Sequence, residues 1–332
     1  READFFLLIG PFQNWETVHS GLLFHATYDK MQTIFLCWIS KGGLSMAPVK
    51  HYNTRNMELH ENQGVSYLTF PSLSAFPFVQ HAFSTRLGGV SRGEFASMNL
   101  SFHRGDPDET VLENYHRFCD AAGFAFDSLV ASAQDHHTEI RRVTKADCGI
   151  GIWRPRDRES VDGLLTDQPG VTLVTYYADC VPLYFLDPVH RAIGLAHAGW
   201  RGTVAGMGMK MAEAMERAFG SKPEELLAAI GPSIGPCCYE VDQPVAEAFA
   251  AKMDWRPENF LKNGGNGKYM LNLWEANRRA LLCAGLLPER ISIAELCTQC
   301  HADLLYSHRA SGGKRGGLAA FFALKEASAC QN

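Results

Sequence analysis

From about residue 66 the chain is a succession of short apolar segments and longer amphipathic ones. Apolar runs rich in β-branched and aromatic residues predict strands. The runs are SYLTF (66–70), FVQHAFST (78–85), LVASAQ (129–134), AIGLAHAGW (192–200), RISIAEL (290–296) and GLAAFFAL (317–324). Residues 171–187, VTLVTYYADCVPLYFLD, form a longer run, which predicts one strand buried on both faces.

Helical periodicity marks three segments. Apolar residues recur on one face after Asp106-Pro107-Asp108-Glu109, and Gly123 ends this segment. A methionine stripe follows residue 203, with Thr203 as the expected N-cap, and a third helix is predicted over 271–284. Strands and helices alternate without strict βαβ order. We therefore predict an α+β fold, a mixed α/β sandwich, in which residues 60–328 form a single compact domain of mixed sheets flanked by helices.

Residues 1–45 are rich in aromatics and follow no clear period. A ribosome-binding sequence would encode Lys41-Gly42-Gly43 if it were translated in frame. Met46 follows at a distance that suits a start codon. We therefore expect residues 1–45 to be a non-native or disordered extension, with Met46 as the true start. The alternative is a small genuine extension that packs Phe5, Phe6, Leu22 and Leu23 onto the domain.

Composition narrows the classes of function. The 332 residues are 46% hydrophobic and 20% charged, with a net charge of −5 and no basic tract, so bulk charge suggests no nucleic acid and no anionic membrane as partner. No apolar run reaches the roughly 18 residues of a membrane span, and no export signal is visible. We expect a cytoplasmic protein with no obligate protein partner, whose ten cysteines are buried thiols, metal ligands or nucleophiles.

Cys180 and His197 are the first candidate site residues. Asp187-Pro188-Val189-His190 has the residue types of a turn, and strands folding back about it place Cys180 directly opposite His197. Such neighbours have Cβ atoms about 4.5–5.5 Å apart, which suits a thiolate and an imidazole binding one metal, or a nucleophile pair. Pro182 and the register are the weak points, and an ordinary packed thiol is the alternative.

A catalytic metal needs a third ligand, and Gln134-Asp135-His136-His137 offers two histidines after a predicted strand. Adjacent residues of an extended chain point to opposite faces, so only one of the two imidazoles is expected to face Cys180 and His197. Two histidines and a cysteine with one open position form a plausible catalytic zinc set. The residues alone leave open which histidine is the ligand.

Residues 197–203, HAGWRGT, combine a strand end, a glycine-rich turn and a helix start. Gly199 and Gly202 allow close backbone approach, and Arg201 offers a guanidinium to an anion such as phosphate. The alternative is an ordinary helix start with a surface arginine. Arg86, in a second polar turn, and Asn99 shortly after it are by themselves typical of turn chemistry.

Four further cysteines lie in two short motifs. Gly231 to Cys238 form a rigid turn ending in the vicinal thiols Cys237 and Cys238. Cys297-x-x-Cys300-His301, with His308 following, has the spacing of a zinc knuckle or a redox motif, but no second Cys-x-x-Cys is present. We expect structural or incidental roles for both motifs.

At this point the chain resembles the laccase-domain family, whose members carry the names polyphenol oxidase and purine nucleoside phosphorylase. The joint pattern of ADCVP and HAGWRGT is highly specific. The matching stretches are HAFSTRLGGVS (81–91), MNLS (98–101), Gln134-x-His136, DGLLTDQPG (162–170), ADCVPLYFLDP (178–188), AHAGWRGT (196–203), IGPSIGPCCYEV (230–241) and LCTQCHADLLYSHR (296–309).

The resemblance implies a mixed α/β sandwich with zinc bound by His136, Cys180 and His197. It favours His136 over His137, although the family commonly has a small residue after the ligand. It further implies activity on purine nucleosides: adenosine, inosine and methylthioadenosine cleaved with phosphate, and adenosine also deaminated. We expect Cys180, Arg86 and Arg201 to be catalytic. The residues expected to bind substrate are Asn99, Gln134, Asp179, Gly199, Gly202 and Thr203.

Two alternatives remain. A copper-dependent polyphenol oxidase is possible because Cys and His ligands also hold copper, but a multicopper cluster needs many imidazoles, and no His-x-His pair occurs among the thirteen histidines. The second alternative is a non-catalytic interaction protein stabilised by zinc, which predicts a closed site of four ligands.

Overall fold

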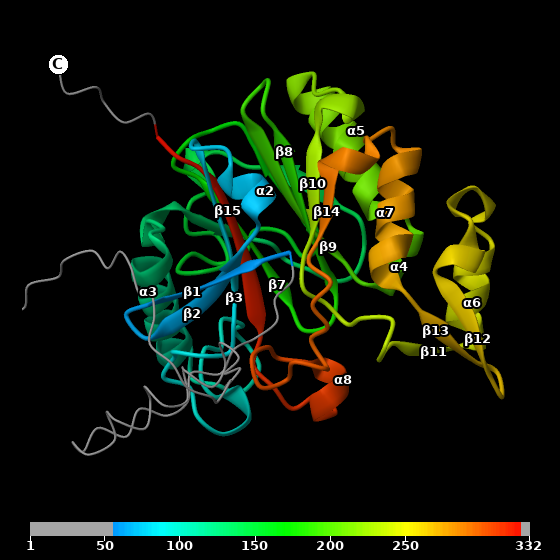
Figure 1. The fold of residues 1–332 in the computed structure, drawn as a ribbon. Coiled ribbons are helices and arrows are strands. Elements are labelled where there is room, and N and C mark those ends of the chain that lie inside the picture. The colour runs from blue at the N-terminus through cyan, green and yellow to red at the C-terminus, as the bar shows by residue number, and fades with distance from the viewer. Residues whose placement is uncertain (1–55, 327–332) are drawn as a thin grey trace, which may run out of the picture. The chain divides into compact units, whose positions relative to one another are not determined.

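The computed structural model describes residues 56–326. Two six-stranded sheets dominate this part of the chain (Figure 1). The first sheet has the order β1 (Glu58–Asn62), β2 (Val65–Thr69), β3 (Val79–Ser84), β15 (Leu318–Leu324), β7 (Thr172–Tyr177), β4 (Leu129–Ala131). The second has the order β14 (Ile291–Ile293), β10 (Leu227–Ile230), β8 (Val181–Asp187), β9 (Ala192–Ala198), β6 (Gly163–Thr166), β5 (Ile140–Arg142). Each is mixed, since β4 with β7, β10 with β14 and β5 with β6 are parallel pairs in otherwise antiparallel sheets.

The two sheets pack face to face. On β8, Leu183 and Phe185 point to the helices on the outer side, whereas Tyr184 between them points to the first sheet. The Tyr184 ring lies 5.4 Å from that of Phe322 on β15, and its hydroxyl donates to the carbonyl of Ala82 on β3 at 3.1 Å. This alternation along a strand buried on both faces is why the segment reads as almost continuously apolar.

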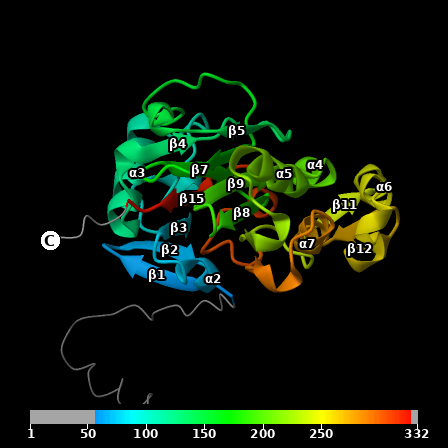
Figure 2. The same ribbon diagram turned by 90° about the horizontal axis from the view of Figure 1, so that it is seen from above.

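Helices cover the outer faces of both sheets, as the view from above shows (Figure 2). α3 (Asp108–Ala122) packs on the first sheet through Val111, Tyr115 and Phe118, and ends at Gly123 in the left-handed conformation. α5 (Met207–Phe219) and α7 (Leu273–Cys283) pack on the second sheet. The predicted mixed α/β sandwich is confirmed.

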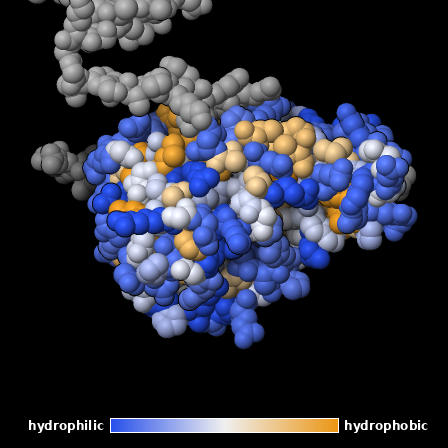
Figure 3. Space-filling view, turned by 90° about the horizontal axis from the view of Figure 1, so that it is seen from below, coloured by the Kyte–Doolittle hydropathy of each residue, from blue (hydrophilic) through white to orange (hydrophobic). Residues whose placement is uncertain are grey.

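Smaller elements complete the described part. The short helices are α2 (Pro71–Ser74), α4 (Trp200–Val204), α6 (Gln243–Ala250) and α8 (His308–Ser311). A three-stranded antiparallel sheet has the order β11 (Glu240–Asp242), β13 (Lys268–Leu271), β12 (Leu261–Gly265). Hydrophilic residues cover most of the face seen from below, with apolar residues gathered in a smaller area (Figure 3). Within residues 56–326, no helix has the length and apolar composition to cross a membrane.

The segment 171–187 forms two strands, and the prediction of one strand is wrong. β7 belongs to the first sheet and β8 to the second, so the chain crosses between sheets over residues 178–180. Asp179 at this crossing has a φ of 86°, which ends the extended conformation. Cys180 therefore lies at a junction between the two sheets rather than within a strand.

The hairpin of β8 and β9 forms, but its register differs by two residues from the prediction. His197 pairs with Pro182, and Asp187 pairs with Ala192 across a loop of residues 188–191. The Asp187 carboxylate accepts hydrogen bonds from the backbone of Val189 and His190 at 2.8 and 3.0 Å, which fixes this longer loop. A shift of two residues preserves the face of every side chain, so Cys180 and His197 still approach each other.

The helix after residue 199 is also divided. Gly199 is the N-cap of α4, Thr203 lies buried inside that helix, and Gly206 in the left-handed conformation separates α4 from α5. The prediction that Thr203 caps the helix is therefore wrong. The expected extension of residues 1–45 and the proposed start at Met46 lie outside the described residues.

Candidate metal centre and its cavity

Three predicted ligands converge where the two sheets meet. His136 lies in the loop after β4, Cys180 precedes β8, and His197 is on β9. One potential ligand atom from each residue lies within 4.8 Å of the other two. His136 and Asp179 both have positive φ angles, 71° and 86°, and these turns direct His136 and Cys180 toward His197. The sequence prediction assumed an extended chain at 134–137, and the structure has a tight turn there instead.

Asp162 organises two of the three ligands from behind. Its side chain is fully buried, and Oδ1 accepts a hydrogen bond from Nδ1 of His197 at 2.7 Å. The same carboxylate accepts backbone N–H groups of Asp135, His136 and His137 at 3.1–3.2 Å. It thus fixes the ring of His197, leaving Nε2 for a metal, and the loop that carries His136. Sequence reasoning matched Asp162 to a family motif but gave it no role.

The electrostatics of the ligands favour a thiolate. Burial raises the pKa of Cys180, but the charge of His197 and hydrogen bonds from both imidazoles outweigh burial and lower it. Burial lowers the pKa of His197, while the Cys180 thiolate and the Asp162 carboxylate raise it, with a net increase. A thiolate is the form in which cysteine binds metals, so the lowered pKa of Cys180 favours the binding of a cation.

The absence of a side chain at Gly199 leaves room for the three candidate ligands. A Cβ at this position would lie 3.0 Å from Sγ of Cys180 and 3.3 Å from Cδ2 of His136, closer than side chains normally pack. Two imidazoles and one thiolate are ligands that zinc accepts, and a catalytic zinc site has three protein ligands and one open position. Because all three ligands line one cavity, the open position would face that cavity. The residues present therefore fit a single zinc ion.

The cavity has a volume of about 620 Å³. Its lining combines the three candidate ligands with aromatic, histidine and arginine side chains. The aromatic residues are Phe102, Tyr176, Tyr177 and Tyr239, the additional histidines are His103 and His308, and the arginines are Arg104, Arg156, Arg309 and Arg315. None of these four arginines is a predicted site residue, although Arg309 ends the matching stretch 296–309.

The four arginines outnumber Asp179, the one carboxylate that the described residues contribute to the cavity lining. The arginine ion pairs found within residues 56–326 involve other arginines. Arg315 is 9% exposed, its NH1 group donates to the carbonyl of Gly316, and its Nε is buried without a hydrogen-bond partner. Burial and the neighbouring Arg104 lower the pKa of Arg315 to about 10, and burial lowers that of Arg104. An anion between them would satisfy the unpaired donor and relieve the repulsion.

Gln134 and Asp179 line the cavity, where they hold its walls. Gln134 bonds to both the backbone N–H and the carbonyl of Tyr176, at 2.6 and 2.8 Å, which ties the His136 loop to β7. The carboxylate of Asp179 accepts from the Thr298 hydroxyl at 2.6 Å and from the backbone of Arg309 at 2.7 Å. Both side chains thus bond to other parts of the protein, and these contacts position the walls of the cavity.

The structure does not bring Arg86 and Asn99 into the cavity lining. The Arg86 guanidinium donates to the carbonyls of Ala96 and Ala302 and stacks on Tyr306. The Asn99 side chain is buried and bonds to Asp106, to the backbone of Ser101 and to Gly317. These contacts fold the loop whose residues 101–104 line the cavity, so both residues act on it through the backbone.

Arg201, Gly202 and Thr203 also lie outside the lining. Arg201 is exposed and stacks on the ring of Trp200 at 4.3 Å, and the Thr203 hydroxyl accepts from Asn277. α4 spans only Trp200–Val204, which is shorter than the helix on which the anion site was predicted. His137 is exposed and pairs with Asp135, so His136 alone of the two histidines reaches Cys180 and His197.

Comparison with known proteins agrees with this fold. The profile of the family described as multi-copper polyphenol oxidoreductase laccase matches residues 80–325. The chain is 40% identical over 246 residues to purine nucleoside phosphorylase YlmD of Geobacillus stearothermophilus, covering 73% of this chain and 89% of that protein. It is 35% identical to human purine nucleoside phosphorylase LACC1, covering 74% of this chain and 56% of the human protein.

Solved structures show the same architecture. A Bacillus licheniformis hypothetical protein, YfiH, superposes with a TM-score of 0.76 at 34% identity, covering 82% of this chain and all of the other. YlmD of Geobacillus stearothermophilus superposes with a TM-score of 0.75 at 36% identity, covering 82% of this chain and 99% of the other. The chain belongs to the laccase-domain family, as its motifs indicated, and its relatives bear the name purine nucleoside phosphorylase.

Proposed function

We propose that this protein is a zinc-dependent purine nucleoside phosphorylase. Its proposed substrates are adenosine, inosine and methylthioadenosine, each cleaved with phosphate to the free base and ribose 1-phosphate or its methylthio analogue, and it also deaminates adenosine. The observation that carries this proposal is that the His136, Cys180 and His197 group and Arg315, whose Nε has no hydrogen-bond partner, line the same cavity. A metal site and an anion site on one cavity suit the joining of phosphate to a bound nucleoside. The names of the relatives support the same reaction.

His136, Cys180 and His197 would hold the zinc, with Asp162 orienting His197. A zinc ion held by these residues would supply Lewis acidity and would favour the deprotonation of a water molecule, which suits deamination. The protein contributes the fixed position of the three side chains, because Asp162 and Gly199 determine where His197 and Cys180 lie.

Arg104 and Arg315 are the proposed phosphate ligands. In phosphorolysis a phosphate oxygen forms a bond to C1′ of the ribose, the bond from C1′ to the purine nitrogen breaks, and the purine leaves with that electron pair and takes up a proton. Two guanidinium groups hold the attacking anion and offset its charge while it is out of water. They line the cavity, and Nε of Arg315 has no hydrogen-bond partner, so they are better candidates than Arg86, which donates to Ala96 and Ala302 outside the lining.

The remaining lining suits a purine nucleoside. The cavity of about 620 Å³ lies within the roughly 300–1,000 Å³ range of small-molecule sites. Tyr176 and Tyr239 offer aromatic rings beside the metal group, against which a planar base can pack.

The two other functions find less support. A multicopper oxidase needs several convergent imidazoles, and in residues 56–326 the metal-ligand group with histidines contains two of them. A non-catalytic zinc protein would close the site with a fourth ligand, whereas these three ligands open into a cavity. We therefore propose that this site binds zinc and is catalytic.

The test is an assay of the full chain with adenosine, inosine and methylthioadenosine, with and without phosphate, and with metal content measured on the same sample. Adenine from adenosine reports phosphorolysis and inosine reports deamination. We expect both products from the zinc-loaded protein and neither from Cys180→Ala, which should keep its fold. Normal metal content and turnover in Cys180→Ala would contradict the site assignment.

A further inference from the structure

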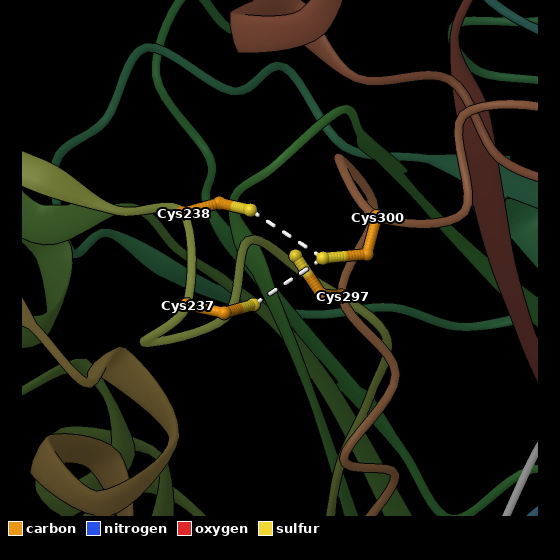
Figure 4. A group of neighbouring side chains, drawn as sticks. All are labelled: Cys237, Cys238, Cys297 and Cys300. Atoms are coloured by element: carbon orange, nitrogen blue, oxygen red, sulfur yellow. Dashed lines mark hydrogen bonds between the residues drawn. The ribbon is translucent and has the colours of Figure 1, made fainter.

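Four cysteines from two distant parts of the chain meet at one place in the fold (Figure 4). Cys237 and Cys238 lie in the turn between β10 and β11, and Cys297 and Cys300 lie in the loop after β14. The four sulfurs all lie within 4.8 Å of one another. Sγ of Cys300 is 3.4 Å from Sγ of Cys237 and 3.4 Å from Sγ of Cys238. Sequence reasoning found a Cys-x-x-Cys without a partner pair, and the fold supplies that pair from the vicinal thiols.

The spacing of the sulfurs suits one tetrahedral metal ion. Zinc bonds to thiolate sulfur at about 2.3 Å, so four sulfurs around one zinc lie about 3.8 Å apart. The observed separations, from 3.4 Å to at most 4.8 Å, bracket that value. A cluster of several metal ions would spread its cysteine ligands further apart. Four thiols and no carboxylate or imidazole form the donor set of a closed structural zinc site.

The surrounding backbone is arranged as it is around metal thiolates. The N–H of Gly235 donates to Sγ of Cys297 at 3.2 Å, and the backbone of Gln299 and Cys300 bonds to the same sulfur. Such donors stabilise a thiolate and fix its direction, as contacts to metal ligands commonly do. Cys297 is buried, whereas Cys237 and Cys300 are exposed, so an ion has a path of entry from solvent.

The two loops are already held side by side by the fold. Ser233 and Cys297 form a parallel bridge, with the Ser233 N–H donating to Leu296 and the Thr298 N–H donating to Ser233. The Ser233 hydroxyl accepts from the ring N–H of Trp274 at 2.6 Å, which anchors the first loop to α7. The cysteines are therefore brought together by a rigid framework.

Both loops also build one wall of the cavity. Tyr239, which lines the cavity, directly follows Cys238. Thr298 lies between Cys297 and Cys300 and donates to Asp179, which directly precedes Cys180. A bond network that joins these loops would thus hold Tyr239 and Asp179 in place.

We propose that Cys237, Cys238, Cys297 and Cys300 bind a second zinc ion, a structural one, separate from the site of His136, Cys180 and His197. This zinc fixes the turn before Tyr239 to the loop that contacts Asp179, and so holds one wall of the cavity. It has no open position and takes no part in the chemistry.

Zinc stoichiometry in the full chain tests this proposal. The protein is purified under reducing conditions, and zinc is measured by mass spectrometry of the elements in the wild type, in His136→Ala/His197→Ala, in Cys297→Ser/Cys300→Ser and in Cys283→Ser. Cys283 is exposed and outside the cluster, so it is the matched control. We expect two zinc ions per chain in the wild type and in Cys283→Ser. We expect one in His136→Ala/His197→Ala and one in Cys297→Ser/Cys300→Ser.

A spectroscopic measurement covers the case in which the serine variant fails to fold. Cobalt replaces zinc in His136→Ala/His197→Ala, where only the four-cysteine site can hold it, and the strong sulfur-to-cobalt absorption of a four-thiolate site is expected. Loss of all zinc from His136→Ala/His197→Ala, iron or copper in place of zinc, or a disulfide among the four cysteines in the reduced, zinc-supplied protein would overturn the proposal.

Discussion

The carboxylate of Asp162 accepts a hydrogen bond from Nδ1 of His197 at 2.7 Å, behind the group that faces the cavity. Asp162 also accepts the backbone N–H groups of the His136 loop, so one buried side chain sets the position of two proposed ligands from two different elements. Partners of this kind orient the ring and raise the basicity of a histidine ligand.

Asp162→Asn should weaken zinc binding at the histidine site by about 10–100-fold, because the amide lacks the charge that supports His197. The measurement is a zinc titration against a competing chelator, with turnover of inosine followed in parallel. Asp167→Asn is the control, since Asp167 is a partly exposed residue that pairs with Arg142. Zinc affinity in Asp162→Asn equal to that of Asp167→Asn would contradict the role of Asp162.

Gly199→Ala should displace Cys180 or His136 and lower zinc occupancy and turnover, because the added Cβ would lie 3.0 Å from Sγ of Cys180. Gly202→Ala is matched in size and sits three residues further along the chain, where the nearest atoms would be 3.5 Å away. We expect Gly202→Ala to bind zinc as the wild type does. Zinc content and thermal unfolding of both variants check this, and equal zinc content in the two would count against the tight packing at Gly199.

Arg104→Gln should raise the KM for phosphate by about tenfold or more while changing the KM for nucleoside less, since an arginine contact to an anion is worth about 1.5–3 kcal/mol. The sequence motif alone predicts this effect for Arg201→Ala. In the structure the Arg201 guanidinium stacks on Trp200 outside the cavity, so Arg201→Ala should change the KM for phosphate less than Arg104→Gln does. Initial rates over a matrix of phosphate and inosine concentrations separate the two, and a larger phosphate effect in Arg201→Ala would return the anion site to α4.

His81 should make the fold less stable in acid. It is buried on β3, its Nε2 accepts the backbone N–H of Phe70 at 2.7 Å, and burial followed by His60 lowers its pKa to about 4 from the ordinary 6.5. Between these two pH values the unfolded chain binds a proton that the folded protein does not. The free energy of unfolding should therefore fall as pH falls from about 6.5 to about 4, by on the order of 3 kcal/mol from this residue.

His81→Gln keeps an acceptor for the Phe70 N–H and removes the titrating ring. Chemical unfolding measured at several pH values between 4 and 7 should show a flatter pH dependence in His81→Gln than in the wild type. His103→Gln serves as the control, because His103 is exposed and lies in a loop. An unchanged slope in His81→Gln would show that His81 is not a source of acid sensitivity.

The sequence predicted the fold class and the convergence of Cys180 and His197 better than it predicted local detail. Apolar alternation determines which face a side chain takes, and the two-residue shift of the hairpin leaves that face unchanged. The loop length depended instead on the Asp187 carboxylate, which binds two backbone N–H groups that no periodicity reveals. The split at Asp179 likewise rests on a single positive φ.

The anion site could not be predicted in the same way. Arg104 and Arg315 lie in loops more than two hundred residues apart in the sequence, and bonds from Gly317 to Asn99 and Leu100 hold the two segments together. The meeting of the four cysteines could not be predicted for the same reason, because the pairing of Ser233 with Cys297 joins loops that are far apart in the sequence. Cys180 and His197 meet through one hairpin, which local patterns predict, whereas no local pattern predicts that the loops of Arg104 and Arg315 or of the four cysteines meet.

The proposed function is tested most directly by the co-products of inosine cleavage in water enriched in ¹⁸O. The zinc-loaded full chain is incubated with inosine and unlabelled phosphate, and the sugar product is analysed by mass spectrometry. We predict one ribose 1-phosphate for each hypoxanthine released, no ¹⁸O at C1′, and no release without phosphate or with Cys180→Ala. Free ribose carrying ¹⁸O, or base release that does not depend on phosphate, would show hydrolysis and contradict the account.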